Sequence, residues 1–242
     1  KNSLRQDTLL VSLMQVNNET GIRQPIDQVT EILNEHPAYF HTDAAQGFGK
    51  DINTLRNPRI DLISISGHKI YAPKGIGALI RRRAKTTTIP IRPLMVGGGQ
   101  ERGLRPGTLP VHLIAGLGEA AKLASRDNVK RQQFNQRFRA ELLHRLGTLE
   151  LIIHGNQDHC LSNTINLSFG DLDSEAIMLG LKDIVAISNG SACTSSTYEA
   201  SHVLVAMGLS EEEAETATRW SWCHLSEMPQ WDRVVAKIKQ LL

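Results

Sequence analysis

His68 and Lys69 stand next to each other in the sequence, directly after Gly67 and a run of small β-forming residues from Ile63 to Ser66. The run predicts a strand that ends at Ser66, which places an imidazole and a primary amine just beyond the strand. An amine in such a position can form a Schiff base with a carbonyl compound. Neighbouring hydroxyl and imidazole groups can donate hydrogen bonds to a phosphate. The stretch therefore has the groups needed to hold a phosphorylated aldehyde.

A further group that could take part in this chemistry is Asp43, which follows an earlier predicted strand. Its carboxylate could keep a pyridine nitrogen protonated. A Schiff-base amine, phosphate donors and an acid partner for a ring nitrogen are together what pyridoxal phosphate requires of a protein. Spacing alone leaves a second interpretation open, in which Lys69 is a solvent-exposed lysine at a strand end.

Polar residues recur at the predicted carboxyl ends of strands, and in open parallel sheets ligands bind at that edge. Each residue also has a local interpretation, such as an Asx-turn at Asn18, a helix cap at Asp43 or a turn hydroxyl at Ser66. Because all of them fall at one edge, we interpret them as candidates for a single site: Asn18, Asp43, Gln46, Ser66, His68 and Lys69.

Cys193 lies in the small, polar stretch NGSACTSSTYE. A thiol with an ordinary pKa of ~8.5 is only partly ionised at neutral pH, so a nucleophilic role would require activation. The alternative is a buried cysteine that packs as a small hydrophobic residue. The surrounding Ser, Gly and Thr residues argue against burial and favour the nucleophile.

The first half of the sequence alternates strands and helices, as α/β proteins with a mostly parallel sheet do. Pro25 suits the first turn of a helix, and apolar residues at spacings of three and four follow it. An Ala/Leu/Gly-rich stretch over 109–125 predicts a further helix that continues to about 146. The predicted strands cover residues 8–16, 38–42, 60–66 and 76–82.

The second half reads as a smaller α+β domain. We expect residues 1–125 to form part of a large cofactor-binding domain and residues 126–242 a small C-terminal domain, with the boundary inside a long helix at roughly 125–150. The predicted strands of the second half cover 163–169, 184–188 and 217–223, and its predicted helices cover 174–182, 200–207 and 230–241.

Composition excludes several classes of protein. The net charge of +2 is too small to indicate a nucleic-acid or membrane-surface partner, and the sequence holds no apolar stretch long enough to span a membrane. Three widely spaced cysteines do not make a disulfide framework, which favours a reducing, cytoplasmic setting.

The sequence begins with Lys1 and runs almost at once into a strand, so we expect that an N-terminal portion is missing.

Four motifs closely resemble the cysteine desulfurases, in particular the group related to iron–sulfur cluster assembly. The similarity runs from Thr8 to about Arg219. It implies the large aspartate-aminotransferase-like fold called fold type I, and L-cysteine as the substrate. The motifs are HTDAAQ at 41–46, SISGHKIYAPKGIG at 64–77, GGGQERGLRPGTLP at 97–110 and SNGSACT at 188–194.

The resemblance implies a pyridoxal 5'-phosphate site. Lys69 is similar to the lysine that forms the Schiff base with the cofactor, and Asp43 to the aspartate that faces the pyridine nitrogen. Gln46 matches the residue near the phenolic oxygen, and Ser66 and His68 match phosphate ligands.

The same resemblance implies a homodimer, because Thr108 resembles the threonine that reaches the phosphate of the partner subunit's cofactor. The resemblance also implies that Asn18 contacts the cofactor. Asn18 and Arg219 match positions that hold the substrate carboxylate. Arg219 suits this role because a guanidinium can pair with a carboxylate through two hydrogen bonds.

Cys193 resembles the family's nucleophile. The implied reaction removes sulfur from L-cysteine, leaves a persulfide on Cys193 and releases alanine, with Lys69 moving the proton of Cα. The sulfur would pass to an acceptor protein, either an iron–sulfur scaffold or an enzyme that thiolates tRNA or DNA. We expect no resident metal and no direct nucleic-acid contact; Cys193 could ligate an iron–sulfur cluster only transiently, together with a partner.

Two departures from the family pattern stand out. Relatives are longer at the N-terminus, where they carry a phosphate loop and a histidine that stacks on the cofactor, so we expect weak cofactor binding by this chain alone. Relatives tend to have Phe and Gly among the positions of RWSWCHL, 219–225, which here contains two tryptophans that enlarge the strand. Cys223, in the same stretch, alternates with apolar residues and is expected in the core.

Two alternatives remain open. One is another fold type I enzyme, such as a selenocysteine lyase or a β-eliminating lyase. The other is a non-catalytic fragment that serves as an interaction module.

Overall fold

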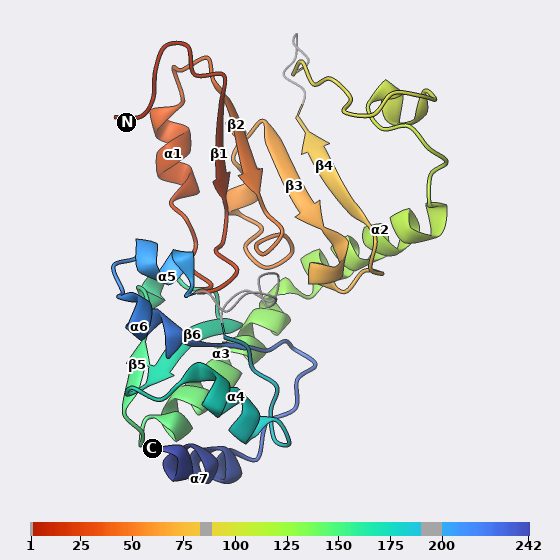
Figure 1. Cartoon of the computed structure of the whole chain (residues 1–242). Helices are drawn as coiled ribbons and strands as arrows, with labels where there is room; N and C mark the ends of the chain where they lie inside the picture. The colour runs from red at the N-terminus through yellow and green to blue at the C-terminus, as the bar shows by residue number, and fades with distance from the viewer. Residues whose placement is uncertain (1, 83–88, 190–199) are drawn as a thin grey trace. The chain divides into compact units, whose positions relative to one another are not determined.

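The computed structural model describes residues 2–82, 89–189 and 200–242 and contains two compact units (Figure 1). The first unit comprises Lys1–Val16 and Gln24–Asn128. The second comprises Asn17–Arg23 and Val129–Leu242. The short segment Asn17–Arg23 therefore belongs with residues that come much later in the sequence.

The first unit is built on a sheet with the strand order β1-β2-β3-β4. The first three strands are parallel, as the alternation of strands and helices predicts, and β4 runs antiparallel to β3. Helix α1, Ile26–Ile32, connects β1 to β2 (Figure 1). The strands are β1 Leu10–Met14, β2 Tyr39–Asp43, β3 Leu62–Ser66 and β4 Gly77–Arg81.

Alternation along these strands turns one face of the sheet into the core, while the opposite face carries a mixture of polar and exposed apolar residues. Phe40 of β2 and Ile63 of β3 are buried with Ile26 and Leu33 from the region of α1, which gives this unit its core. On the opposite face β1 exposes Ser12, and the adjacent strands turn polar residues to the same side. Side chains along a strand alternate between faces, so the polar residues of this face form rows across the sheet.

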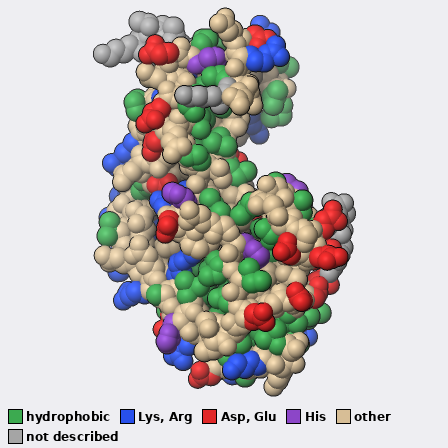
Figure 2. Space-filling model, turned by 90° about the vertical axis from the view of Figure 1, so that its left-hand side faces the viewer, with side chains coloured by type: hydrophobic (Ala, Val, Ile, Leu, Met, Phe, Trp, Pro, Cys, Tyr) green, Lys and Arg blue, Asp and Glu red, His purple; other side chains and the backbone are tan. Residues whose placement is uncertain are grey.

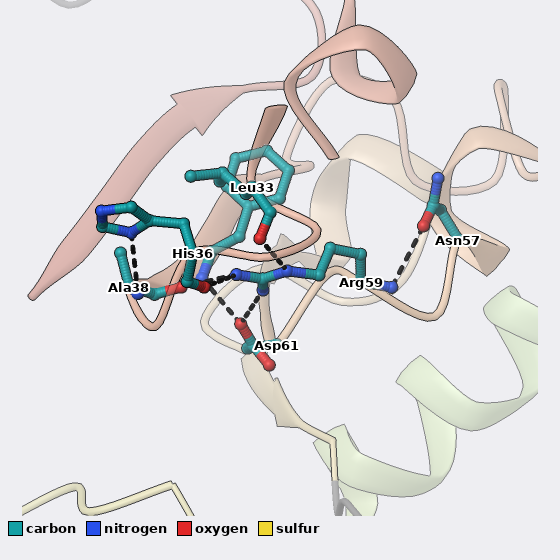
Figure 3. Close-up of polar contacts among 7 residues, drawn as sticks. Leu33, His36, Ala38, Asn57, Arg59 and Asp61 are labelled. Atoms are coloured by element: carbon teal, nitrogen blue, oxygen red, sulfur yellow. Dashed lines mark hydrogen bonds and ion pairs between the residues drawn. The ribbon is translucent and has the colours of Figure 1, made fainter. Parts of the chain in front are cut away.

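Arg59 connects the loop before β3 with the end of α1 and the start of β2 (Figure 3). Its Nη1 lies 2.7 Å from Oδ2 of Asp61, and its Nε donates to the carbonyl oxygen of Leu33 at 2.9 Å. Its Nη2 donates to the carbonyl oxygens of His36 and Ala38, at 3.2 and 2.6 Å. The guanidinium thus donates to three backbone carbonyls between the end of α1 and the start of β2 while it pairs with Asp61.

Helix α2, Val111–Arg126, packs on the 3₁₀ turn Gly67–Ile70 that follows β3. Ala120 is buried there with Ile70 and Ala72. The single helix expected over 109–146 is in fact two helices, because α2 ends before Asp127 and α3, Asn128–Leu146, begins after it. Asp127 has φ −99° and ψ 8°, which interrupts the regular helical path. Two further 3₁₀ turns of this unit are Thr54–Arg56 and Gln100–Gly103.

The second unit contains an antiparallel sheet with the order β5-β6-β7. One face of the sheet is buried against α3, α4 and α7, and Phe138, Leu167 and Ile238 lie in that core. The elements are β5 Leu151–Ile153, the 3₁₀ turn Gln157–His159, β6 Thr164–Phe169, β7 Thr218–Ser221, and helices α4 Ser174–Leu181, α5 His202–Ala206, α6 Glu211–Glu215 and α7 Trp231–Leu241.

Several expectations for this unit need correction. No strand forms over 184–188; only Ser188 makes an isolated bridge, to Arg219. The strand expected over 217–223 ends at Ser221, so Cys223 lies beyond it and is half-buried rather than in the core. Both tryptophans are buried in the core, where Trp222 stacks on Phe138 with ring centroids 5.0 Å apart.

Hydrophobic side chains are also exposed on the surface, as Figure 2 shows for one face of the molecule. They include Leu10 and Met14 on β1 and Leu79 on β4. Among the described helices, none is long and apolar enough to cross a membrane.

Candidate functional site

Asp43 and Ser66 come to the same edge and the same face of the first unit's sheet. Asp43 is the last residue of β2, and Ser64 of β3 is its partner in register. Ser66 lies two residues further along β3 and so turns to the same face as Ser64. The carboxylate of Asp43 is exposed, and its Oδ1 accepts a hydrogen bond from the backbone N–H of Ala45 at 2.8 Å. This local bond fixes the carboxylate at the strand end.

The turn that carries His68 and Lys69 follows β3 immediately. It depends on Gly67, because a Cβ at that position would lie 2.9 Å from the carbonyl oxygen of Ile76. A Cβ at Gly77 would lie 2.6 Å from the carbonyl oxygen of Ile65. The two glycines thus allow the backbones of β3 and β4 to approach closely at the base of the turn. The turn ends at Tyr71, which has a left-handed φ of 73°.

The side chains of Ser66 and His68 lie next to each other at this turn. Ser66 Oγ lies 3.0 Å from Nδ1 of His68, which is exposed. Lys69 is half-buried, and its ammonium group makes no hydrogen bond or ion pair within the described part of the chain. The structure therefore brings a hydroxyl, an imidazole and an available amine to one strand end.

Gln46 and Thr108 also belong to the first unit. Gln46 is half-buried just after β2, and its Oε1 lies 3.5 Å from Nζ of Lys50. Thr108 is exposed in the segment before α2. That segment also contains Glu101 and Arg102, whose φ angles of 49° and 59° are unusual for residues other than glycine.

His41 was not among the residues expected from the sequence, although it lies two residues before Asp43 on the same face of β2. Its Nδ1 lies 2.7 Å from Oγ of Ser12 on β1, and its Nε2 lies 2.8 Å from Oγ of Ser64 on β3. The imidazole therefore bridges three parallel strands next to the residue that ends the middle strand. Two sequence signals could have pointed to it: the alternation of His41 with Asp43, and its place at the start of the motif HTDAAQ.

Asn18 and Arg219 come together in the second unit. Arg219 Nη1 donates to the backbone carbonyl oxygen of Asn18 at 3.1 Å. The contact uses the main chain of Asn18, a detail that residue types alone do not predict. The neighbouring Glu19 is buried and accepts a hydrogen bond from Ser201 Oγ, while Asn17 Oδ1 accepts from the backbone N–H of Glu19 at 2.9 Å.

Cys193, the expected nucleophile, lies outside the described residues. The two described cysteines, Cys160 and Cys223, are not in a disulfide. Burial raises the pKa of the Cys160 thiol, an effect that Arg139 opposes. Its Sγ lies 3.2 Å from the carbonyl oxygen of Thr20, so Cys160 packs structurally against the segment Asn17–Arg23.

The first unit's residues fit pyridoxal phosphate by their chemistry. An amine without a described partner, Lys69, could bind the aldehyde, and Ser66 and His68 offer hydroxyl and imidazole donors for the phosphate. Asp43 offers a carboxylate at the end of the neighbouring strand. By contrast, no group of three or more His, Cys, Asp or Glu within the described ranges is placed to hold a metal ion.

The family model for class-V aminotransferases matches residues 1–232, so the chain belongs to that family. Among its relatives are proteins named cysteine desulfurase IscS. The one from Rickettsia prowazekii is 46% identical over 222 residues, covering 91% of this chain and 53% of the relative. The one from Vibrio vulnificus is 42% identical over 238 residues, covering 98% of this chain and 58% of the relative. The chain thus spans about half the length of the curated relatives it matches.

Solved structures agree with this relationship and confirm the α/β fold of type I. DndA from Streptomyces lividans is 48% identical with a TM-score of 0.79, and the match covers 92% of this chain and 63% of that one. A NifS-like protein from Rickettsia africae is 30% identical with a TM-score of 0.84, covering 97% of this chain and 62% of that one.

Proposed function

We propose that the protein is a pyridoxal-phosphate-dependent cysteine desulfurase, which converts L-cysteine to L-alanine and carries the sulfur as a persulfide on Cys193. The observation that carries the proposal is the amine of Lys69 just beyond β3, beside Ser66 and His68 and at the same sheet edge as Asp43. Relatives named cysteine desulfurase support the choice of reaction.

When bound, pyridoxal phosphate supplies an aldehyde carbon and an electron-withdrawing pyridinium ring. Asp43 would keep the ring nitrogen protonated. Ser66 and His68 would hold the phosphate, and Gln46 would lie near the phenolic oxygen. Thr108 would contact the phosphate of a second subunit, which makes the protein a homodimer in this proposal.

The substrate's carboxylate would bind to Arg219 and Asn18, which already contact each other. Lys69 would remove the proton from Cα. The Cys193 thiolate would then attack Sγ of the substrate, so that an S–S bond forms and the Cβ–Sγ bond breaks. A proton delivered to Cβ and a proton returned to Cα complete L-alanine, and the persulfide passes to a sulfur acceptor, either an iron–sulfur scaffold or a tRNA- or DNA-modifying enzyme. We place this chemistry in the cytoplasm, where thiols stay reduced.

The test follows sulfur and alanine separately in the full-length holoprotein. The parent protein is expected to release L-alanine from L-cysteine and to gain one sulfur atom at Cys193, detected by peptide mass spectrometry after alkylation. Cys193→Ser should abolish both, because it lacks the attacking sulfur, whereas Cys223→Ser serves as the control and should retain both. Alanine formation by Cys193→Ser at the parental rate would rule out the proposed nucleophile.

The same assay separates the main alternative. A selenocysteine lyase would act on L-selenocysteine without comparable activity toward L-cysteine, and a β-eliminating lyase would yield pyruvate in place of alanine.

A further inference from the structure

Asn166, in the middle of β6, is a buried polar residue whose side chain has no partner in the part of the chain that the structure describes. It has no solvent exposure, and within 2–82, 89–189 and 200–242 neither Oδ1 nor Nδ2 makes a hydrogen bond. Buried amides are nearly always hydrogen-bonded, because an unpaired buried donor or acceptor loses its interactions with water without replacement. A functional role for Asn166 would explain why Oδ1 and Nδ2 are buried without hydrogen bonds.

The immediate neighbours of Asn166 on its own strand do not share this property. Ile165 and Leu167 point into the core on one side of the sheet. Ser168, two residues along and on the same face as Asn166, is also buried, but its Oγ lies 2.7 Å from Nε2 of His154 and 2.9 Å from Oγ1 of Thr216. The second unit thus satisfies one polar group on this face of β6 and leaves the adjacent one unsatisfied.

The backbone hydrogen bonds show which side chain lies beside Asn166. Its cross-strand partner in β7 is Arg219. The backbone N–H and carbonyl of Arg219 bond to Ser188, on the side away from β6, at 2.6 and 3.2 Å. The carbonyl of Asn166 accepts from the N–H of His154, on the side away from β7. The two residues therefore form a non-hydrogen-bonded antiparallel pair, in which the side chains stand closest, with Cα atoms about 4.5 Å apart.

The chemistry of the pair is complementary. A guanidinium carries five N–H donors and no acceptor, while the carboxamide of Asn166 offers an acceptor at Oδ1. In this structure Nη1 of Arg219 donates to the carbonyl oxygen of Asn18. A guanidinium can present two parallel N–H groups to a carboxylate, and an acceptor on its other edge would help to hold it in the plane that this pairing needs.

We propose that Asn166 is a positioning residue for Arg219, with its Oδ1 accepting a hydrogen bond from the guanidinium when Arg219 binds the α-carboxylate of an amino-acid substrate. The inference rests on the carboxylate-binding role given to Arg219 in the proposed function. The buried acceptor Oδ1, which has no hydrogen-bond donor among the described residues, would then be used when the substrate's carboxylate binds.

The test uses Asn166→Leu, which has nearly the same shape and removes the acceptor. Removing two unsatisfied groups should leave the melting temperature of the holoprotein equal or higher. At the same time KM for L-cysteine should rise about tenfold with kcat within about twofold, because the lost contact helps to bind the carboxylate and takes no part in the chemistry. Asn166→Asp keeps an acceptor beside the guanidinium and should hold KM within about threefold of the parent.

Ser168→Ala is the matched control. It removes a buried polar side chain from the same face of the same strand and should lower the melting temperature without changing KM. A binding measurement then tests the carboxylate directly: calorimetry should show that the parent prefers L-alanine to L-alaninamide and that Asn166→Leu loses about tenfold of this preference.

Each outcome bears on the inference separately from the proposed function. An unchanged KM and an unchanged preference for L-alanine in Asn166→Leu would overturn it, even if the parent desulfurates cysteine. A parent protein that shows no preference for the carboxylate would overturn it as well. Sulfur transfer to Cys193 is measured in a separate assay. If that activity alone is absent, the calorimetric comparison of L-alanine with L-alaninamide still tests the role of Asn166. If Asn166→Leu does not fold, the same titrations on Asn166→Ala apply.

Discussion

Ser66 Oγ lies 3.0 Å from Nδ1 of His68, across the first turn after β3. The contact holds a hydroxyl and an imidazole together at the strand end, directly before Lys69. Two donors that are already placed side by side lose little freedom when they bind an anion.

We therefore expect Ser66→Ala to weaken cofactor binding. Loss of one hydrogen bond to a charged phosphate should raise the Kd for pyridoxal phosphate by about tenfold. Equilibrium dialysis of the apoprotein measures the change. Ser125→Ala, an exposed serine on α2, is the control and should bind as the parent does; equal affinity in both variants would contradict a phosphate role for Ser66.

Lys69→Ala should remove the visible absorbance that pyridoxal phosphate shows when joined to a lysine amine. The half-buried amine of Lys69 is available within the described chain, whereas Lys74, in the same hairpin, is exposed. Lys74→Ala should therefore keep the absorbance. A yellow Lys69→Ala protein with a modified peptide at another lysine would assign the linkage elsewhere.

Arg59→Ala should destabilise the first unit. It removes the ion pair with Asp61 and the donors to three backbone carbonyls, and it leaves Asp61 partly buried without its cation. We expect a loss of about 2–3 kcal/mol in the free energy of unfolding, measured by urea denaturation of the apoprotein.

Arg5→Ala gives the comparison for Arg59, because Arg5 pairs with Asp7 at the surface. Exposed pairs contribute little, so the expected loss is about 0.5 kcal/mol or less. Equal losses in the two variants would show that the contacts of Arg59 in Figure 3 add nothing beyond a surface pair.

His154 should make stability depend on pH in mildly acidic solution. Burial lowers the pKa of its imidazole from 6.5, an effect that Glu213 opposes, and Ser168 bonds to its Nε2. A group whose pKa is lower in the folded state takes up protons more readily when unfolded. The stability from His154 is therefore fully present above 6.5 and falls as the pH drops below that value.

The melting temperature should accordingly decline from pH 7.5 to about pH 5. His154→Gln should reduce the decline over this range, since an amide has no proton to gain. A parental slope that is unchanged in His154→Gln would assign the pH dependence to other groups.

The parallel strands were predictable because each combines β-forming residues with a polar strand end. Their common edge followed from the α/β rhythm, so Asp43 and Ser66 could be assigned to one place before the structure was known. The bridging role of His41 could not, because it depends on the register of three strands. The division of the chain into domains 1–125 and 126–242 stays a prediction.

Shorter elements gave weaker signals. Strand β5 has only three residues, too few for alternation to show. Helix α6 is also short, but Ser210 and Glu213 form a capping box, a sequence pattern that could have revealed it. The strand wrongly expected over 184–188 has apolar residues of the right kind, but Ile184 and Val185 bond back to Leu181 and Ser188 forms only an isolated bridge.

The segment Asn17–Arg23 has a consequence for biosynthesis. Ile22 forms a backbone bridge with Cys160, and the carbonyl oxygen of Gly21 accepts from the N–H of Leu161. The ribosome synthesises this segment well before residues 129–242. The segment therefore cannot form these contacts with Cys160 and Leu161 until those residues have been translated. For the same reason, a fragment made of residues 129–242 alone would lack a segment that belongs to its own compact unit. Co-expression of a peptide covering 17–23 should improve the yield of such a fragment.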